Sequence, residues 1–176
     1  MTTRALVSFA VLAVPLLSSC THAAEETSQP ARSTPSAPAA AAPGKPTPKP
    51  DARVVITPAG GGAPITVHVE VVRSPNDIKR GLMYRQHLPP DQGMLFLMSK
   101  EEVQSFWMKN TLIPLDMLFI SADKRVAGIV ENTEPLTLTS RRIDEPTLYV
   151  LEVNGGWSQA HGVTAGATAA FDNVNE

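Results

Sequence analysis

The sequence predicts a mainly β protein: a compact single domain, either a barrel or a sandwich, with one short helix, preceded by a signal peptide and a disordered linker. Residues 65–72 alternate between apolar and polar types and are rich in β-branched side chains, as in a half-buried strand. Several later apolar runs are short and end in turn-forming residues. Alanine, proline, serine and threonine dominate residues 21–50, and a patterned sequence then begins, so we place the folded domain at residues 53–173.

The first twenty residues have the pattern of an export signal. Arg4 precedes an apolar run from Ala5 to Leu17, which is too short to span a bilayer as a helix. The small residues directly before Cys20 resemble a bacterial lipobox, in which the cysteine is acylated and becomes the mature N-terminus. We therefore expect a signal peptide at 1–19 and lipidation at Cys20, the only cysteine of the chain. The alternative is an ordinary cleaved signal peptide with an incidental cysteine.

Residues 20–52 have the composition of a tether. Seven prolines lie between residues 30 and 50, among alanine, serine and threonine, and such a segment has too few apolar side chains to build a core. Its proline-rich part favours polyproline II, so about thirty residues would reach on the order of 90 Å when stretched. A proline-rich recognition motif or a wall-binding stretch is the alternative.

Within the domain, residues 65–72 form the first expected strand. Ser74-Pro75-Asn76-Asp77 then combines an N-cap, a proline at the first helical position and an acidic residue in the first turn, which predicts a helix that ends near Tyr84. A glycine opens the next strand candidate, residues 93–98. Three further strands are expected.

These later strands are residues 115–121, 126–130 and 147–153, and residues 122–125 should form the turn between the first two. A brief helical turn is expected near residues 157–161. A meander of this kind closes into a barrel or a sandwich.

From Asp51 onward the chain has eleven Lys and Arg against fifteen Asp and Glu, a net charge of −4. No basic stripe stands out that would collect phosphates, so nucleic acid is not an expected partner. The sequence carries no signal for a particular oligomeric state.

Residues 105–120 contain three polar residues within an otherwise apolar run: Lys109, Asn110 and Asp116. An unpaired buried charge costs several kcal/mol, so these groups should lie at a pocket mouth or in a buried polar network. In the first case they form the floor of a ligand site. In the second, Lys109 pairs with Asp116 or Glu152, and Asn110 makes the turn that precedes Pro114.

Further contacts are expected from Arg80, as part of an anion site, and from Trp107, as a platform for a sugar ring. Arg80 is alternatively a solvated or capping residue. If residues 105–108 are a strand, either Trp107 or its two neighbours face the core, and we expect Trp107 to be the buried one. Trp157, in a glycine-rich loop, is either exposed or a plug at the end of the barrel.

The sequence is compatible with two other chemistries. Five methionines between residues 83 and 117, with His68 or His87, are compatible with a Cu(I) site, although core filling is the default explanation for them. Asp116 with Glu152 or Glu131 would give the carboxylate pair of a glycan hydrolase. No nucleophile elbow, zinc-binding helix, Walker loop or dinucleotide fingerprint is present in the sequence, so no cofactor or metal is predicted.

Six ordered motifs carry a resemblance to a known family. They are Arg80–Met83, Leu88–Pro89, Gly93–Phe96, Phe106–Thr111, Pro114–Asp116 and Leu151–Val153. In these the domain resembles the bacterial and archaeal family called domain of unknown function 192. The resemblance implies a compact, mainly β domain with one helix packed on it, and no established activity. Residues 154–157 depart from the usual pattern of that family.

The leading hypothesis is therefore an exported, lipid-anchored protein of the cell envelope that faces the periplasm. Its domain would be a non-enzymatic binding or accessory module, and its partner a wall glycan, a small polar molecule or another envelope protein. The predicted ligand contacts are Lys109, Asn110, Asp116, Arg80, Trp107 and Glu152. A carboxylate-based hydrolase and a copper-binding protein are the alternatives.

Overall fold

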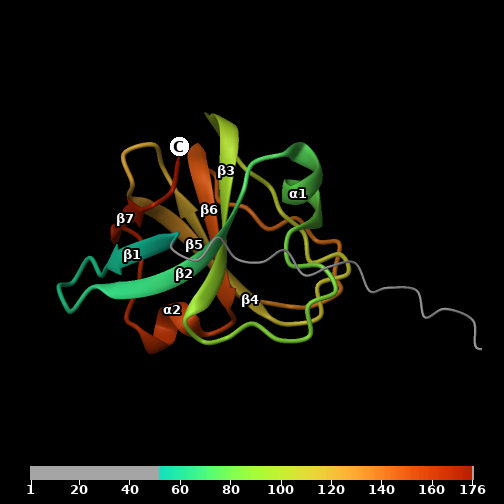
Figure 1. Cartoon of the computed structure of the whole chain (residues 1–176), viewed down its shortest axis with the longest axis horizontal. Coiled ribbons are helices and arrows are strands. Elements are labelled where there is room, and N and C mark those ends of the chain that lie inside the picture. The colour runs from blue at the N-terminus through green and yellow to red at the C-terminus, as the bar shows by residue number, and fades with distance from the viewer. Residues whose placement is uncertain (1–51, 176) are drawn as a thin grey trace, which may run out of the picture. The chain divides into compact units, whose positions relative to one another are not determined.

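The computed structural model describes residues 52–175, which form a seven-stranded mixed sheet with two short helices (Figure 1). The strands are β1 (Arg53–Thr57), β2 (Ile65–Val72), β3 (Gln92–Glu102), β4 (Leu115–Ile120), β5 (Val126–Thr133), β6 (Thr147–Asn154) and β7 (Thr168–Asp172). The helices are α1 (Pro75–Arg80) and α2 (Trp157–Ala160). The mainly β prediction is confirmed. The predictions for residues 1–19, Cys20 and the tether up to residue 51 fall outside the described residues.

The sheet has the strand order β5-β4-β6-β3-β2-β1-β7. β2 and β3 pair in parallel, whereas the other neighbours in the sheet pair antiparallel. A parallel pair needs a crossover connection, because the chain must return to the same end of the sheet. Residues 73–91 are that connection, and they carry α1 across one face (Figure 1).

The sheet curls until its two edge strands meet at one corner. Arg125 and Thr168 form an antiparallel bridge between the start of β5 and the start of β7. Beside it, the N–H of Val126 donates to the carbonyl of Ala167 at 2.8 Å, and the N–H of Ala169 donates to the carbonyl of Lys124 at 2.8 Å. The result is a half-barrel, so the barrel alternative describes this domain better than the sandwich.

Alternating side chains of the central strands build two cores, one on each face of the sheet. The inner core lies within the curl and draws on all seven strands together with Trp157 of α2. The outer core lies on the other face of β3, β6 and β4, beneath Leu82 and Met108 of the long connections. On β4, Leu118 and Ile120 point into the inner core, whereas Met117 and Phe119 point into the outer one.

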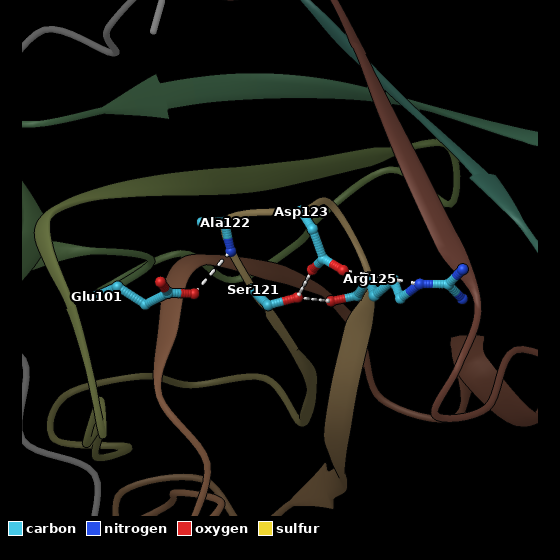
Figure 2. A network of polar contacts seen from close by, with 5 residues as sticks. All are labelled: Glu101, Ser121, Ala122, Asp123 and Arg125. Carbon is cyan, nitrogen blue, oxygen red and sulfur yellow. Dashed lines mark hydrogen bonds and ion pairs between the residues drawn. The ribbon is translucent and has the colours of Figure 1, made fainter.

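The predicted turn at residues 122–125 is confirmed, and polar contacts fasten it (Figure 2). Ser121 Oγ lies within hydrogen-bond distance of the Asp123 carboxylate and, at 3.0 Å, of the Arg125 carbonyl. The hydrogen bond from Ser121 lowers the pKa of Asp123 below its usual value. The N–H of Ala122 donates to the Glu101 carboxylate at 2.8 Å, which ties the turn to the end of β3.

Helix α1 begins as the sequence predicts and ends earlier. The N–H of Asp77 donates to Ser74 Oγ at 3.2 Å, which confirms the N-cap. The helix stops before Gly81, whose φ of 45° is unfavourable for other residue types, so the predicted end near Tyr84 was wrong. The strands β1 and β7 were not predicted. Within residues 52–175, no helix has the length and apolar character needed to cross a membrane.

Candidate functional site

A cavity of about 350 Å³ opens on the outer face of the sheet. Its walls come from α1 and the residues after it, from β3 and β6, and from the connections before β4 and before β6. The lining residues are Ile78, Lys79, Arg80, Gly81, Leu82, Met83, Phe96, Met98, Ser105, Phe106, Trp107, Thr111, Leu138, Ser140 and Glu152. The volume falls at the lower end of the range of small-molecule sites.

Glu152 is the buried ionisable group of this cavity. It lies on β6 with Met94 of β3 and Met117 of β4 as its cross-strand neighbours, so all three side chains share the outer face. The residue is 4% exposed, and its carboxyl has no hydrogen-bond or ion-pair partner among residues 52–175. Burial raises the pKa of this carboxyl from 4.5 to about 8. Glu152 therefore carries its proton at neutral pH.

The mouth of the cavity is aromatic and cationic. Trp107 is 41% exposed, and the Nζ atom of Lys109 lies 5.5 Å from the centre of its ring. Lys79 and Arg80 reach the lining from the exposed side of α1. The hydroxyls of Ser105 and Ser140 lie 2.8 Å apart and join the two long connections at the same cavity.

The expectation that Trp107 is buried was wrong. Phe106 and Met108 turn inward instead: Phe106 packs edge-on against Phe96 at 5.0 Å between ring centres, and Met108 is fully buried in the outer core. The segment is not a regular strand, since only Phe106 forms an isolated bridge, with Arg141. The Trp107 ring consequently stays accessible to solvent, with Lys109 Nζ on one side of it.

Asp116 does not line the cavity. Its cross-strand partner on β6 is Val153, the residue next to Glu152. Because neighbouring residues of a strand point to opposite faces, Asp116 points to the inner face and Glu152 to the outer one. Its side chain is fully buried, and its carboxylate accepts hydrogen bonds from the N–H groups of Asn132 at 2.7 Å, Gly156 at 2.9 Å and Ser158 at 2.8 Å. Asp116 thus fastens β5 and the start of α2 to β4.

Asn110 and Lys109 also lie outside the cavity lining. Asn110 has a φ of 56°, and Tyr84 has a φ of 64°, which is uncommon for an aromatic residue. The two hold each other: Asn110 Nδ2 donates to the Tyr84 hydroxyl at 2.7 Å, and the Tyr84 N–H donates to the Asn110 carbonyl at 2.8 Å. Lys109 forms no ion pair with Asp116 or Glu152 in the described part of the chain, and its contact is with Trp107.

The methionines of the copper hypothesis divide between the outer core and the cavity lining. Met94, Met108 and Met117 are packed in the outer core, and residues 52–175 contain no group of three His, Cys, Asp or Glu placed to hold a metal ion.

Trp157 is buried and stacks on His161 with 4.5 Å between the ring centres. Of the two placements that the sequence allows for Trp157, the structure therefore shows the plug at the end of the barrel.

Of the six residues selected from the sequence, the structure brings three into one cavity: Arg80, Trp107 and Glu152. The sequence analysis missed Lys79, Ser105 and Ser140. Lys79 directly precedes Arg80 on a helix that was predicted, so its inclusion was within reach. Nothing in the pattern of residues 134–146 marks Ser140, because that connection has neither alternation nor helical spacing.

Fold and site together define a small half-barrel domain with a ligand-sized cavity on the outer face of its sheet. The chain belongs to the DUF192 family, whose model, described as "Uncharacterized ACR, COG1430", matches residues 55–171. The cavity draws lining residues from four of the motifs that carry the resemblance: Arg80–Met83, Gly93–Phe96, Phe106–Thr111 and Leu151–Val153.

Two solved structures share the fold. A protein from Sinorhizobium meliloti 1021, described as a "putative transcription regulator", is 38% identical over 69% of this chain and 93% of its own, with a TM-score of 0.66. A protein of unknown function from Novosphingobium aromaticivorans DSM 12444 is 36% identical over 67% of this chain and 83% of its own, with a TM-score of 0.64. No curated protein gives a significant match.

Proposed function

We propose that this protein is a non-enzymatic binding module and that its ligand site is the cavity on the outer face of the sheet. One observation carries the proposal: Arg80, Trp107 and Glu152, which the sequence singles out for separate reasons, line a single cavity together with residues from four family motifs. Small-molecule sites combine an apolar, aromatic lining with a few convergent polar groups, and this cavity has that composition.

The ligand class that fits best is a glycan fragment of one or two rings. Trp107 presents an apolar ring at the mouth, and sugars stack their apolar faces on such rings. Ser105, Ser140 and Glu152 supply hydrogen-bonding groups for the hydroxyls of a sugar. The size of the cavity favours a short fragment over a long chain.

Two other functions have weaker support: the hydrolase that the sequence offered as an alternative, and a role in transcription. A hydrolase that uses Asp116 and Glu152 would need both carboxyls beside one bond, and they point to opposite faces of the sheet. Glu131 is exposed and does not line the cavity. A role in transcription, suggested by the description of the S. meliloti relative, would require a basic surface, whereas the chain from Asp51 onward has a net charge of −4.

We further infer that the module works in the cell envelope, anchored through Cys20 on the tether. The support is the export-signal pattern of residues 1–19 and the small residues before Cys20. Cells grown with radiolabelled palmitate should label the wild type and should not label Cys20→Ala. Equal labelling of both proteins, or none in the wild type, would contradict the anchor.

The binding proposal is tested with the full chain and calorimetric titration of wall-derived mono- and disaccharides. Trp107→Ala should weaken binding about tenfold or more, because it removes the stacking surface. Leu112→Ala is the matched control: Leu112 is similarly exposed, at 40%, but lies outside the lining, so binding should not change. Equal affinity in Trp107→Ala and wild type, or no binding of any fragment, would refute the proposal.

A further inference from the structure

We propose that the cavity selects an acidic sugar, whose negative group is held by Lys79 and Arg80 at the mouth while Glu152 donates a hydrogen bond from within. This inference rests on the proposed function and names the ligand class of the same site. It follows from the charges of the lining and from the unsatisfied carboxyl of Glu152.

The lining is positive at neutral pH. Its ionisable side chains are Lys79, Arg80 and Glu152, and the last of these is held in its uncharged form by burial. Among the described residues, no carboxylate lies within ion-pair distance of Lys79 or Arg80. Five other cations do have a carboxylate partner: Arg53, Arg85, Lys100, Arg125 and Arg142. The ammonium of Lys109, over the Trp107 ring, adds a third positive charge beside the mouth. An anionic group would therefore be attracted there.

The interior supplies a hydrogen-bond donor with no protein acceptor. A protonated carboxyl has one O–H to donate, and burial alone, with no hydrogen-bond or charge partner among residues 52–175, raises the pKa of the Glu152 carboxyl. Met94 and Met117 close off the two sides of Glu152 along the sheet, so its polar atoms can reach a partner through the cavity. A carbonyl, carboxylate or hydroxyl oxygen of a ligand would satisfy the donor.

The groups around Glu152 are uncharged or already paired, so they do not prevent its carboxyl from donating a hydrogen bond to a ligand. Met94 on β3 and Met117 on β4 face it from the neighbouring strands, and Ser105, Thr111 and Ser140 face the cavity from the connections. Glu70 on β2 lies in the same cross-strand row beyond Met94, but Arg85 holds it with two hydrogen bonds of 2.6 and 2.5 Å.

The arrangement makes ligand binding sensitive to pH. As the pH rises through about 8, Glu152 loses its proton, and the site loses its donor and gains a negative charge. Both changes oppose an anionic ligand, so affinity should fall. A cationic ligand, held between the Trp107 ring and an ionised Glu152, would show the reverse and would also meet repulsion from Lys79 and Arg80.

The test compares N-acetylmuramic acid with N-acetylglucosamine, which differ by an ether-linked lactyl group that carries the carboxylate, in calorimetric titrations of the full chain. At about pH 6 the acidic sugar should bind about tenfold more tightly, and at about pH 9.5 its affinity should fall by about tenfold. Arg80→Gln should abolish most of the preference for the acidic sugar. Arg142→Gln, an exposed cation outside the lining, should keep it.

Glu152→Gln provides the second readout, because an amide keeps a donor and does not titrate in this range. Its affinity for the acidic sugar should be nearly constant between the two pH values. Equal binding of the two sugars, lost in Trp107→Ala, would overturn this inference and leave the binding module standing. Stronger binding at high pH, an unchanged pH profile in Glu152→Gln, or no binding of either sugar would also overturn it.

Discussion

Asp116 and Glu152 are buried carboxyl groups on adjacent strands, and the protein accommodates them in different ways. Three backbone N–H groups donate hydrogen bonds to the Asp116 carboxylate, and these bonds offset the cost of removing the charge from water. Glu152 has no such shell among the described residues and keeps its proton instead. The first arrangement stabilises the fold, and the second leaves a polar group that lines the cavity without a partner among residues 52–175.

Glu152 should make the protein less stable as the pH rises. Its pKa is raised in the folded state, to about 8 from 4.5, so its contribution is fully present below about pH 4.5 and is lost as the pH rises through about 8. The loss is on the order of 5 kcal/mol over that interval. Urea unfolding across this range should show Glu152→Gln gaining stability relative to wild type with increasing pH. A constant difference between the two proteins would show that Glu152 is ionised in the fold.

Asp116→Asn should lower the free energy of unfolding by about 3 kcal/mol, since the amide group turns a donor toward backbone N–H groups that need an acceptor. Urea denaturation measures the loss. Asp144→Asn, at a side chain that is 91% exposed, is the control and should leave stability unchanged. Wild-type stability in Asp116→Asn would mean that the three hydrogen bonds contribute little.

At the scale of elements, Gly93 sets how closely β3 and β6 approach. A Cβ atom at this position would lie 2.6 Å from the carbonyl oxygen of Glu152. Gly93→Ala should therefore push the strands apart and cost about 2 kcal/mol or more, measured by thermal or urea unfolding. Gly60→Ala is the matched control, because a Cβ there meets no atom within 4 Å. Equal stability of the two variants would show that β6 can shift away from the added Cβ atom at little cost in free energy.

The elements also show what the sequence could predict. The strands β2, β4 and β6 carry their own alternation or apolar run, and α1 carries its own N-cap, so local pattern located them. β1 pairs with the neighbouring β2 as well as with β7, and its run Val54–Thr57 is β-branched, so a local signal for this strand was present and was overlooked. β7, at Thr168–Asp172, has a weaker pattern and pairs with β1 from the other end of the domain. Its pairing could not be read from the local sequence.

The same limit applied to the site. Arg80, Trp107 and Glu152 line one cavity, whereas Asp116, which was predicted to belong to the same site, does not. Whether Asp116 and Glu152 share a face depends on the register of β4 against β6, in which Met117, not Asp116, lies opposite Glu152. Neither strand reveals that register by itself.

At the scale of the whole domain, β7 completes the sheet by covering β1. Removing residues 168–176 should expose that strand, open the inner core at Ala169 and abolish the cooperative thermal transition. A shorter truncation that removes only residues 175 and 176 should unfold like the full chain. A cooperative thermal transition in the longer truncation would mean that the domain folds with six strands and does not need β7.

The place of β1 between β2 and β7 governs when this domain can fold. β1 is made early, but its second neighbour comes from the other end of the domain, so the sheet closes over a long stretch of intervening chain. Contacts so distant in sequence slow folding, because a large loop must close before they form. A chain that emerges residue by residue, from a ribosome or through a membrane pore, therefore cannot finish this sheet until its last strand has cleared the exit.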